Sequence, residues 1–335
     1  MKEYRIIDYS IEYQQKLKNF LKLHNPSFSD TYIDFLVDNA WNENHEEPAI
    51  LVVDEEDNIV GEHLFFYTNA KINGTEQKVK WSHDTFLEES ARKLIGLDFV
   101  LKINNRTDSF GIGLSNTNKK IAKKTKYVYW APLYTYLLFN PYFILASLKK
   151  IIGIVPKCSF IQMEQIEVNN SIFRIATSEK ELKIPNEGYW GGDSGYDIEF
   201  VRDDAYINKR FFSNPVHQYY FYHLLTDNEY DEAYFVIRPI IYKGMKALCV
   251  ADFRYNLKES SQLNHIIKAV MKLAHKNSCG IVHMTTSDQT MFQLLKKKRW
   301  VRTRSGDFTL SSVHVNKDNY SIMATLADPD GEYHL

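Results

Sequence analysis

The sequence has little of what marks several common protein classes. Its three cysteines, Cys158, Cys249 and Cys279, are widely spaced and form no C-x-x-C pair. Such a small, odd number argues against a disulfide framework and fits a reducing compartment. The first five residues, MKEYR, do not form an apolar signal segment, so we expect a cytoplasmic protein.

An excess of charge of one sign is also lacking. The 41 Lys and Arg residues are balanced by 42 Asp and Glu residues, and the formal net charge is −1. A near-neutral chain has no overall attraction to nucleic acid, so we expect no nucleic-acid partner. With 44% hydrophobic and 25% charged residues, the composition excludes a disordered, collagen-like or polytopic membrane protein. A length of 335 residues predicts about two domains.

The common catalytic signatures do not occur. There is no G-x-S-x-G, no H-E-x-x-H and no P-loop, and Gly111 and Gly113 lack the third glycine of a dinucleotide-binding loop. We expect no metal site. A run of glycine and aromatic residues from Gly188 to Tyr196 is either a substrate-facing loop or a plain connection.

Hydrophobic periodicity predicts alternating strands and helices in both halves. In the first half, strands are expected at 5–9, 49–53, 59–67, 77–84, 110–114 and 127–138. Helices are expected at 13–23, from a cap at Asp30, at 91–103 and at 119–126. In the second half, strands are expected at 230–238, 246–253, 280–284 and 321–326, and helices at 262–276 and 288–297.

The two halves follow the same order, which indicates an internal repeat. The strand ends Asp84 and Asp252 lie 168 residues apart, and the strands that begin at Gly111 and Gly280 lie 169 apart. Two copies of one α+β unit explain this spacing, and two unrelated α/β pieces are the alternative.

Residues 130–148 carry no charge over 19 residues, which is close to the length of a membrane-spanning helix. Pro132, Asn140 and Pro141 interrupt this stretch. We therefore expect a strand up to Asn140 and then an amphipathic connecting helix to about Ile152. Weak association of this helix with a membrane surface stays open.

The order of elements resembles the GNAT family, the Gcn5-related acyl-CoA-dependent acyltransferases, and two copies resemble its tandem members near polysaccharide functions. Local stretches similar to that family are His83–Val100, Ser115–Asn118 before Tyr127, Asp203–Phe211 before Asn214-Pro215 and Tyr219, and Thr325–Asp330. The resemblance implies an α+β fold with two GNAT-like domains, each a mixed, mostly antiparallel sheet flanked by helices. The domains are expected at 1–140 and 196–335, joined by a connecting helix and loop at 141–195.

The resemblance also implies acetyl-CoA or another acyl-CoA as co-substrate. A loop that opens a helix offers free N–H groups and a positive dipole end to a pyrophosphate. The family pattern Gln/Arg-x-x-Gly-x-Gly/Ala falls on Ala91–Gly96 and keeps only Gly96. The cofactor-binding residues expected from this are Phe86, Leu87, Arg92, Lys93, Leu94, Gly96 and Asn116. The second-half stretch Leu257–Asn264 has no glycine, so we expect one cofactor site, in the first half.

Acyl transfer needs a base for the acceptor and a proton for the leaving thiolate. Asp84 is our first choice of base, with His83 and Glu88 beside it at the strand end. The tyrosine that serves as acid in the family corresponds to Ala122 here and to Leu295 in the second copy, and neither can donate a proton. Tyr134 is our candidate substitute.

These residues favour transfer of an acyl group to an amino or hydroxyl acceptor, either a small molecule or a saccharide. Two alternatives stay open: aminoacyl transfer from charged tRNA, as in Fem-type proteins, and a non-catalytic binding or scaffold protein. The sequence does not indicate an oligomeric state.

Overall fold

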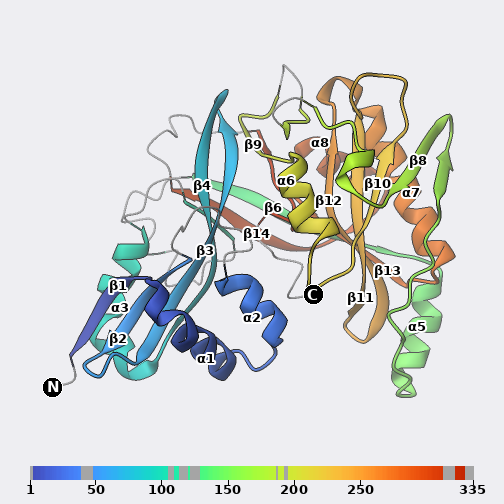
Figure 1. The fold of residues 1–335 in the computed structure, drawn as a ribbon. Coiled ribbons are helices and arrows are strands. Elements are labelled where there is room, and N and C mark those ends of the chain that lie inside the picture. The colour runs from blue at the N-terminus through green and yellow to red at the C-terminus, as the bar shows by residue number, and fades with distance from the viewer. Residues whose placement is uncertain are drawn as a thin grey trace. The chain divides into compact units, whose positions relative to one another are not determined.

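A computed structural model describes residues 3–38, 48–104, 109–112, 120, 129–185, 188–191, 195–311 and 321–328. The chain forms two compact units that are not consecutive in sequence (Figure 1). The first unit consists of Met1–Asn69, Gln77–Ala131 and Asp307–Asp318. The second unit consists of Ala70–Glu76, Pro132–Gly306 and Asn319–Leu335.

The first unit is a mixed sheet with helices on both faces. Its strands, in spatial order, are β1 (Tyr4–Asp8), β2 (Ala49–Asp54), β3 (Ile59–Ile72), β4 (Thr75–Leu87), β5 (Ser109–Ile112) and the end of β14 (Val301–Ser311). Strands β1, β2 and β3 pair antiparallel, whereas β4 and β5 pair in parallel. The helical elements are η1 (Ile11–Tyr13), α1 (Gln14–His24), α2 (Asp30–Val37) and α3 (Glu89–Asn104).

Alternating side chains of the first sheet build a separate core on each face. Leu51 and Leu64 pack with Leu17 and Phe20 of α1, and Ile33 of α2 joins the same cluster. A second cluster on the other face is formed by Ala91 and Phe99 of α3 and by residues of the sheet. The sheet residues are Ile50, Val52, Val60, Phe65 and Leu87. Helix α2 begins one residue away from the expected cap, because the Ser29 hydroxyl, not Asp30, accepts a hydrogen bond from the Tyr32 N–H at 3.2 Å.

The second unit repeats this arrangement. Its strands, in spatial order, are β7 (Gln165–Val168), β8 (Ser171–Ala176), β10 (Tyr220–Leu224), β11 (Ala233–Tyr242), β12 (Met245–Tyr255), β13 (Ile281–Thr286) and β6 (Tyr129–Phe139). The short β15 (Ile322–Met323) pairs with β9 (Ile198–Phe200). The helical elements are α5 (Tyr142–Ile151), η2 (Glu179–Glu181), α6 (Asp204–Ile207), η4 (Asn208–Phe212), η5 (Leu257–Glu259), α7 (Ser261–Lys276) and α8 (Gln289–Lys297).

The central hairpins of the two repeats use the same turn. Asn73-Gly74 joins β3 to β4 and Lys243-Gly244 joins β11 to β12, and all four residues have positive φ. Two such residues form the primed turn whose twist matches that of the strands it joins. Because β12 and β13 also pair in parallel across α7, as β4 and β5 do across α3, the repeat expected from the sequence is present. The expected α+β fold class is confirmed.

Each repeat gives its last strand to the other unit. Residues 134–139 of β6 pair antiparallel with β13 in the second unit, and Phe308–Ser311 of β14 pair antiparallel with β5 in the first. The expected division at residues 140 and 196 treated the two domains as consecutive. The expected division stays a prediction for the limits of the two repeats. The compact units have other limits, because the last strand of each repeat pairs in the other unit.

Helix α7 supports the core of the second unit as its periodicity predicted. The five predicted apolar positions, Leu263, Ile266, Ile267, Val270 and Leu273, are all fully buried. Each contributes about 1.5–3 kcal/mol relative to an exposed side chain. Within the described residues, no helix is both long enough and apolar enough to cross a bilayer.

Candidate functional site

Polar side chains gather at the end of β4 in the first unit. The Asn25 amide donates to Asp84 Oδ2 at 3.2 Å, and the Tyr32 hydroxyl lies 3.0 Å from His83 Nε2. Asn25 follows α1 and Tyr32 belongs to α2. Two of the predicted catalytic residues, His83 and Asp84, therefore lie half-buried against the same pair of helices.

Strand β4 departs from regular alternation at this place. The His63 ring contacts Thr85 Oγ1 at 2.6 Å and Ser82 Oγ at 3.3 Å. Residues three apart on a regular strand face opposite sides, so the strand is irregular between them. Such an irregularity re-aims side chains and is common beside active sites. It allows the consecutive residues His83 and Asp84 to reach neighbouring partners, Tyr32 of α2 and Asn25 after α1.

Glu62 of β3 is a candidate that the sequence reading missed. Its side chain is fully buried, and neither carboxyl oxygen makes a hydrogen bond with a residue that the structure describes. Burial raises its pKa well above the usual value, the Asp84 charge raises it further, and the nearby Phe86 amide opposes this only in part. The shift favours the neutral form of Glu62 relative to that of an exposed carboxyl group. The available signal was a carboxyl group next to His63 in the mostly apolar first half of β3.

The stretch Ala91–Gly96 lies inside helix α3, as the helix expected at 91–103 implied, but α3 begins two residues earlier, at Glu89. The cofactor-binding role of this stretch stays a prediction. The Arg92 N–H already donates to Glu88 O at 2.9 Å. The N–H groups without an acceptor inside the helix are those of its first turn, residues 89–91. A Cβ on Gly96 would meet only ordinary contacts at 3.5 and 3.7 Å, so close backbone approach does not require glycine there.

The other expected cofactor residues surround the start of α3. Arg92 donates to Leu87 O at 2.8 Å, and Lys93 lies 3.8 Å from Glu89 in solvent. Leu94 is exposed and Leu87 is buried below the helix. The cofactor roles of these residues stay predictions.

Phe86 and Glu88 both contact His24 at the end of α1. The Phe86 ring stacks on the His24 ring at 4.3 Å, and Glu88 Oε1 lies 3.6 Å from His24 Nε2.

Two further predicted site residues are not found beside the end of β4. Asn116 is outside the described residues, and Tyr134 belongs to the second unit, where it stacks on Phe292 at 4.8 Å.

In the second unit, the corresponding strand end is covered by the chain's own tail. Strands β12 and β13 pair from Ala247 to Val250, and residues 324–328 then bond to both of them. The Ala327 N–H donates to Ala251 O at 3.1 Å on the β12 side. Thr325 forms a bridge with Thr286 on the β13 side. The tail therefore occupies the space between the diverging strands.

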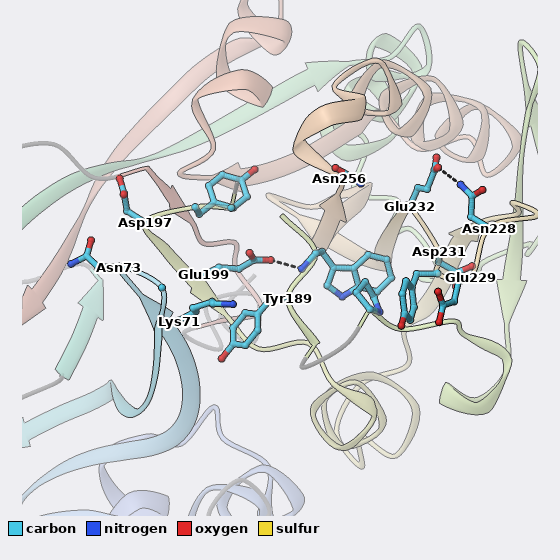
Figure 2. Close-up of a pocket in the computed structure, with 16 residues that line it drawn as sticks. Lys71, Asn73, Tyr189, Asp197, Glu199, Asn228, Glu229, Asp231, Glu232 and Asn256 are labelled. Carbon is cyan, nitrogen blue, oxygen red and sulfur yellow. Dashed lines mark hydrogen bonds between the residues drawn. The ribbon is translucent and has the colours of Figure 1, made fainter. Parts of the chain in front are cut away.

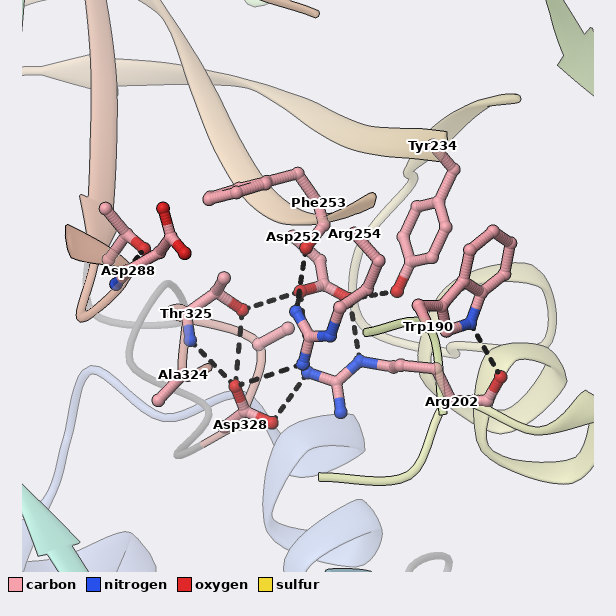
Figure 3. A network of polar contacts seen from close by, with 12 residues as sticks. Trp190, Arg202, Tyr234, Asp252, Phe253, Arg254, Asp288, Ala324, Thr325 and Asp328 are labelled. Carbon is pink, nitrogen blue, oxygen red and sulfur yellow. Dashed lines mark hydrogen bonds and ion pairs between the residues drawn. The ribbon is translucent and has the colours of Figure 1, made fainter. Parts of the chain in front are cut away.

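A buried network of ions fixes this tail (Figure 3). Asp252 accepts from Arg202 Nε, Arg254 Nη1 and Thr325 Oγ1, each at 2.7 Å. Arg202 Nη2 donates to Asp328 at 2.6 Å. Burial alone would raise the pKa of Asp252, but the two guanidinium groups lower it to about 2. Asp252, which the sequence spacing matches with Asp84, is fully buried and neutralised, so it cannot serve as a base.

The second unit also contains a cavity of about 1050 Å³ (Figure 2). Its lining is rich in carboxyl groups and aromatic rings and includes one lysine. These residues are Asp197, Glu199, Glu229, Asp231, Glu232, Tyr189, Trp190, Tyr196, Tyr230 and Lys71. The run from Gly188 to Tyr196, which the sequence left open between a substrate-facing loop and a plain connection, supplies part of this wall.

The cavity walls are held by backbone hydrogen bonds. Glu199 accepts from the Trp190 N–H at 2.8 Å, and Asp231 accepts from the Lys183 N–H at 3.0 Å. Burial raises the pKa of Glu199, although nearby guanidinium and N–H groups oppose the shift. Lys71 Nζ lies 5.2 Å from the centre of the Tyr189 ring, so the protein itself places an ammonium against this aromatic wall. Carboxyl groups and ring faces together suit a cationic ligand.

No family model matches the sequence. No curated protein matches it either. Among the described residues, no group of three His, Cys, Asp or Glu side chains is placed to hold a metal ion.

Solved structures match the fold over most of the chain. A protein from Enterococcus faecalis V583, described as a probable N-acyltransferase, has a TM-score of 0.58 at 10% identity, covering 93% of this chain and 74% of its own. A GCN5-related N-acetyltransferase from Anabaena variabilis ATCC 29413 has a TM-score of 0.57 at 12% identity, covering 92% and 72%. Saccharomyces cerevisiae N-myristoyltransferase with bound myristoyl-CoA and inhibitors has a TM-score of 0.55 at 10% identity, covering 95% and 83%. The chain thus has the GNAT fold that its sequence resembled.

Proposed function

We propose that the protein is an acyl-CoA-dependent acyltransferase whose donor binds to the first unit and whose acceptor is an amine. One observation carries the choice of unit. In the second unit, residues 324–328 fill the space between the diverging strands and two guanidinium groups neutralise Asp252. In the first unit, Asp84 is half-buried, accepts a hydrogen bond from the neutral amide of Asn25 and interacts with the buried Glu62, whose pKa is raised. The names of the three solved structures, two acyltransferases and one probable N-acyltransferase, support the reaction class.

The first turn of α3 is the proposed place for the donor's diphosphate. Its N–H groups at residues 89–91 have no acceptor within the helix, and they point along the positive end of the helix dipole. Lys93 is close enough to pair with an anion there. The carboxylates of Glu88 and Glu89 oppose an anion at this place, so binding depends on the backbone donors and on Lys93.

The carboxyl pair Asp84–Glu62 is the proposed proton-handling group. An acceptor ammonium must lose a proton before its nitrogen attacks the thioester carbonyl, and Asp84 accepts this proton. The new C–N bond forms as the C–S bond breaks, and the departing thiolate takes a proton. Glu62, whose pKa burial raises, is the proposed source of that proton, in place of the missing tyrosine.

The acceptor class is inferred from the names of two of the solved structures, a probable N-acyltransferase and a GCN5-related N-acetyltransferase. Both names describe transfer to nitrogen. A polyamine or a basic peptide offers such a nitrogen, and a neutral saccharide with hydroxyl groups alone does not, so we propose the amine and not the sugar as acceptor.

A transfer assay tests this proposal. Acetyl-CoA and longer acyl-CoA esters are incubated with spermidine, a lysine-containing peptide or a neutral sugar, and free CoA is measured by chromatography. We expect release of CoA that depends on the amine. Glu62→Gln and Asp84→Asn should each lower the rate about 100-fold, the lower end of what general acid–base groups contribute.

Glu55→Gln, in the exposed turn between β2 and β3, is the matched control and should leave the rate unchanged. If no acyl-CoA ester binds in calorimetry and none releases CoA with any acceptor, the proposed reaction is wrong. If the sugar reacts as fast as the amines, the proposed acceptor class is wrong.

A further inference from the structure

Exposed apolar side chains are concentrated in one short part of the second unit. Of the sixteen exposed large apolar residues in the described part of the chain, nine lie between residues 139 and 161. They are Phe139, Ile144, Leu145, Leu148, Ile151, Ile152, Ile154, Val155 and Ile161. Single exposed apolar residues are ordinary on a protein surface, but a contiguous group of this size marks an interaction site.

Helix α5 is apolar on two opposite faces. Phe143 and Ala146 pack into the core cluster of β12 and β13, and Ser147 lies 3.6 Å from the sulfur of Met245. The opposite stripe, at 144, 148, 151 and 152, follows helical spacing and is open to solvent. Packing within the unit therefore accounts for one face and leaves the other without a cover among the described residues.

The charge around this stripe is of one sign. No Asp or Glu occurs anywhere from residue 109 to residue 163. Lys149 and Lys150 form the last turn of α5, and Lys157 follows in the next segment. A groove of about 480 Å³ beside α5 is lined by apolar residues together with Lys149, Lys157, Lys246 and Lys276, and by no carboxyl side chain.

We propose that this surface, α5 and the segment up to Ile161, docks on an anionic lipid bilayer. An apolar stripe flanked by lysines is the pattern of a helix that lies in the plane of a membrane surface. At ten residues α5 is about 15 Å long, half the thickness of the hydrocarbon core, so it lies on the bilayer and does not cross it. The inference does not depend on the proposed acyl transfer.

A second copy of the chain fits this surface less well. A symmetric dimer apposes the same patch on both copies, so pairing through α5 would bring Lys149 and Lys150 close to their own counterparts. Like charges at an apolar interface repel, whereas lipid phosphates and carboxylates neutralise them. The excess of lysine therefore favours the bilayer as the occupant.

Vesicle sedimentation tests the proposal with the full chain. The probes are phosphatidylcholine vesicles with and without about 30% phosphatidylserine, at about 50 mM and about 500 mM salt. We expect binding to the anionic vesicles that weakens at high salt. Lys149→Gln with Lys150→Gln should weaken it at least tenfold, and Ile151→Ser with Ile152→Ser should weaken it to a similar degree. Both isoleucines are largely exposed, so the melting temperature should not change.

The matched control is Lys296→Gln with Lys297→Gln, an exposed lysine pair in the last turn of α8 of the same unit. It should bind as the unaltered protein does. Equal loss in this control would show a general charge effect and would overturn the proposal. Failure to bind any vesicle would also overturn it. A dimer in light scattering that the Ile151→Ser, Ile152→Ser variant separates would then identify a second copy as the occupant.

Discussion

Replacing Arg202 by methionine should strongly destabilise the second unit. The guanidinium is fully buried and pairs with Asp252 at 2.7 Å and with Asp328 at 2.6 Å. Without it, two buried carboxylates share the single charge of Arg254. Breaking a buried network by removing one partner costs about 3–5 kcal/mol, since it leaves an uncompensated charge. At about 2–4 °C for each kcal/mol, the melting temperature should fall by about 6–20 °C.

Thermal and urea unfolding, followed by circular dichroism, measure this loss. Arg174→Met, on the exposed side of β8, is the matched control and should change stability by less than about 0.5 kcal/mol. The double variant Arg202→Met, Asp328→Asn removes one charge of each sign, so it should lose less stability than the sum of the single variants. Additive losses, or a loss below about 1 kcal/mol for Arg202→Met, would refute the reasoning.

Three further predictions concern acid stability, thiol exposure and a strained turn. The pKa of Asp252 is about 2 in the folded protein and about 3.9 in the unfolded chain. Its ionisation therefore contributes about 2–3 kcal/mol to the free energy of unfolding above about pH 4, and this contribution is lost as the pH falls toward 2. Acid unfolding of Asp252→Asn should lack this part of the pH dependence. A thiol reagent should modify one cysteine in the native protein, the exposed Cys158, and the two buried cysteines only in urea; rapid modification of all three would contradict the structure. Gly188→Ala should lower the free energy of unfolding in urea more than Gly74→Ala does. Both positions have positive φ, but only at 188 would a Cβ lie 2.5 Å from a backbone nitrogen. Equal losses of stability would show that the contact is relieved.

The elements with strong local patterns could be predicted from the sequence. Helix α7 has five apolar residues at helical spacing, and α8 begins after Asp288, whose carboxylate accepts from the Met291 N–H. The Asn73-Gly74 turn is encoded by two residues that tolerate positive φ. Local chemistry decides each of these, so a single sequence suffices.

What the sequence did not predict depends on pairing between distant segments. Strand β6 is apolar and strand β14 is mostly polar, but neither pattern identifies the strand that it pairs with. The pairings of β6 with β13 and of β14 with β5 are decided only in the assembled sheets. The carboxyl group of Glu62 was visible in the sequence, but its meeting with Asp84 follows from the irregular β4 beside β3. Helix α3 begins at Glu89, two residues before the expected start at 91, because nothing in Glu89 and Ser90 stops the helix from beginning there.

Hydrogen exchange with and without acetyl-CoA, read by mass spectrometry, tests most directly which unit takes the acyl donor. We predict slower exchange in peptides that cover residues 82–92, at the end of β4 and the start of α3. Peptides that cover 250–260 and 284–288 should exchange equally fast in both conditions, because residues 324–328 already fill that part of the second unit. Protection of 250–260 without protection of 82–92 would contradict the assignment of the donor to the first unit.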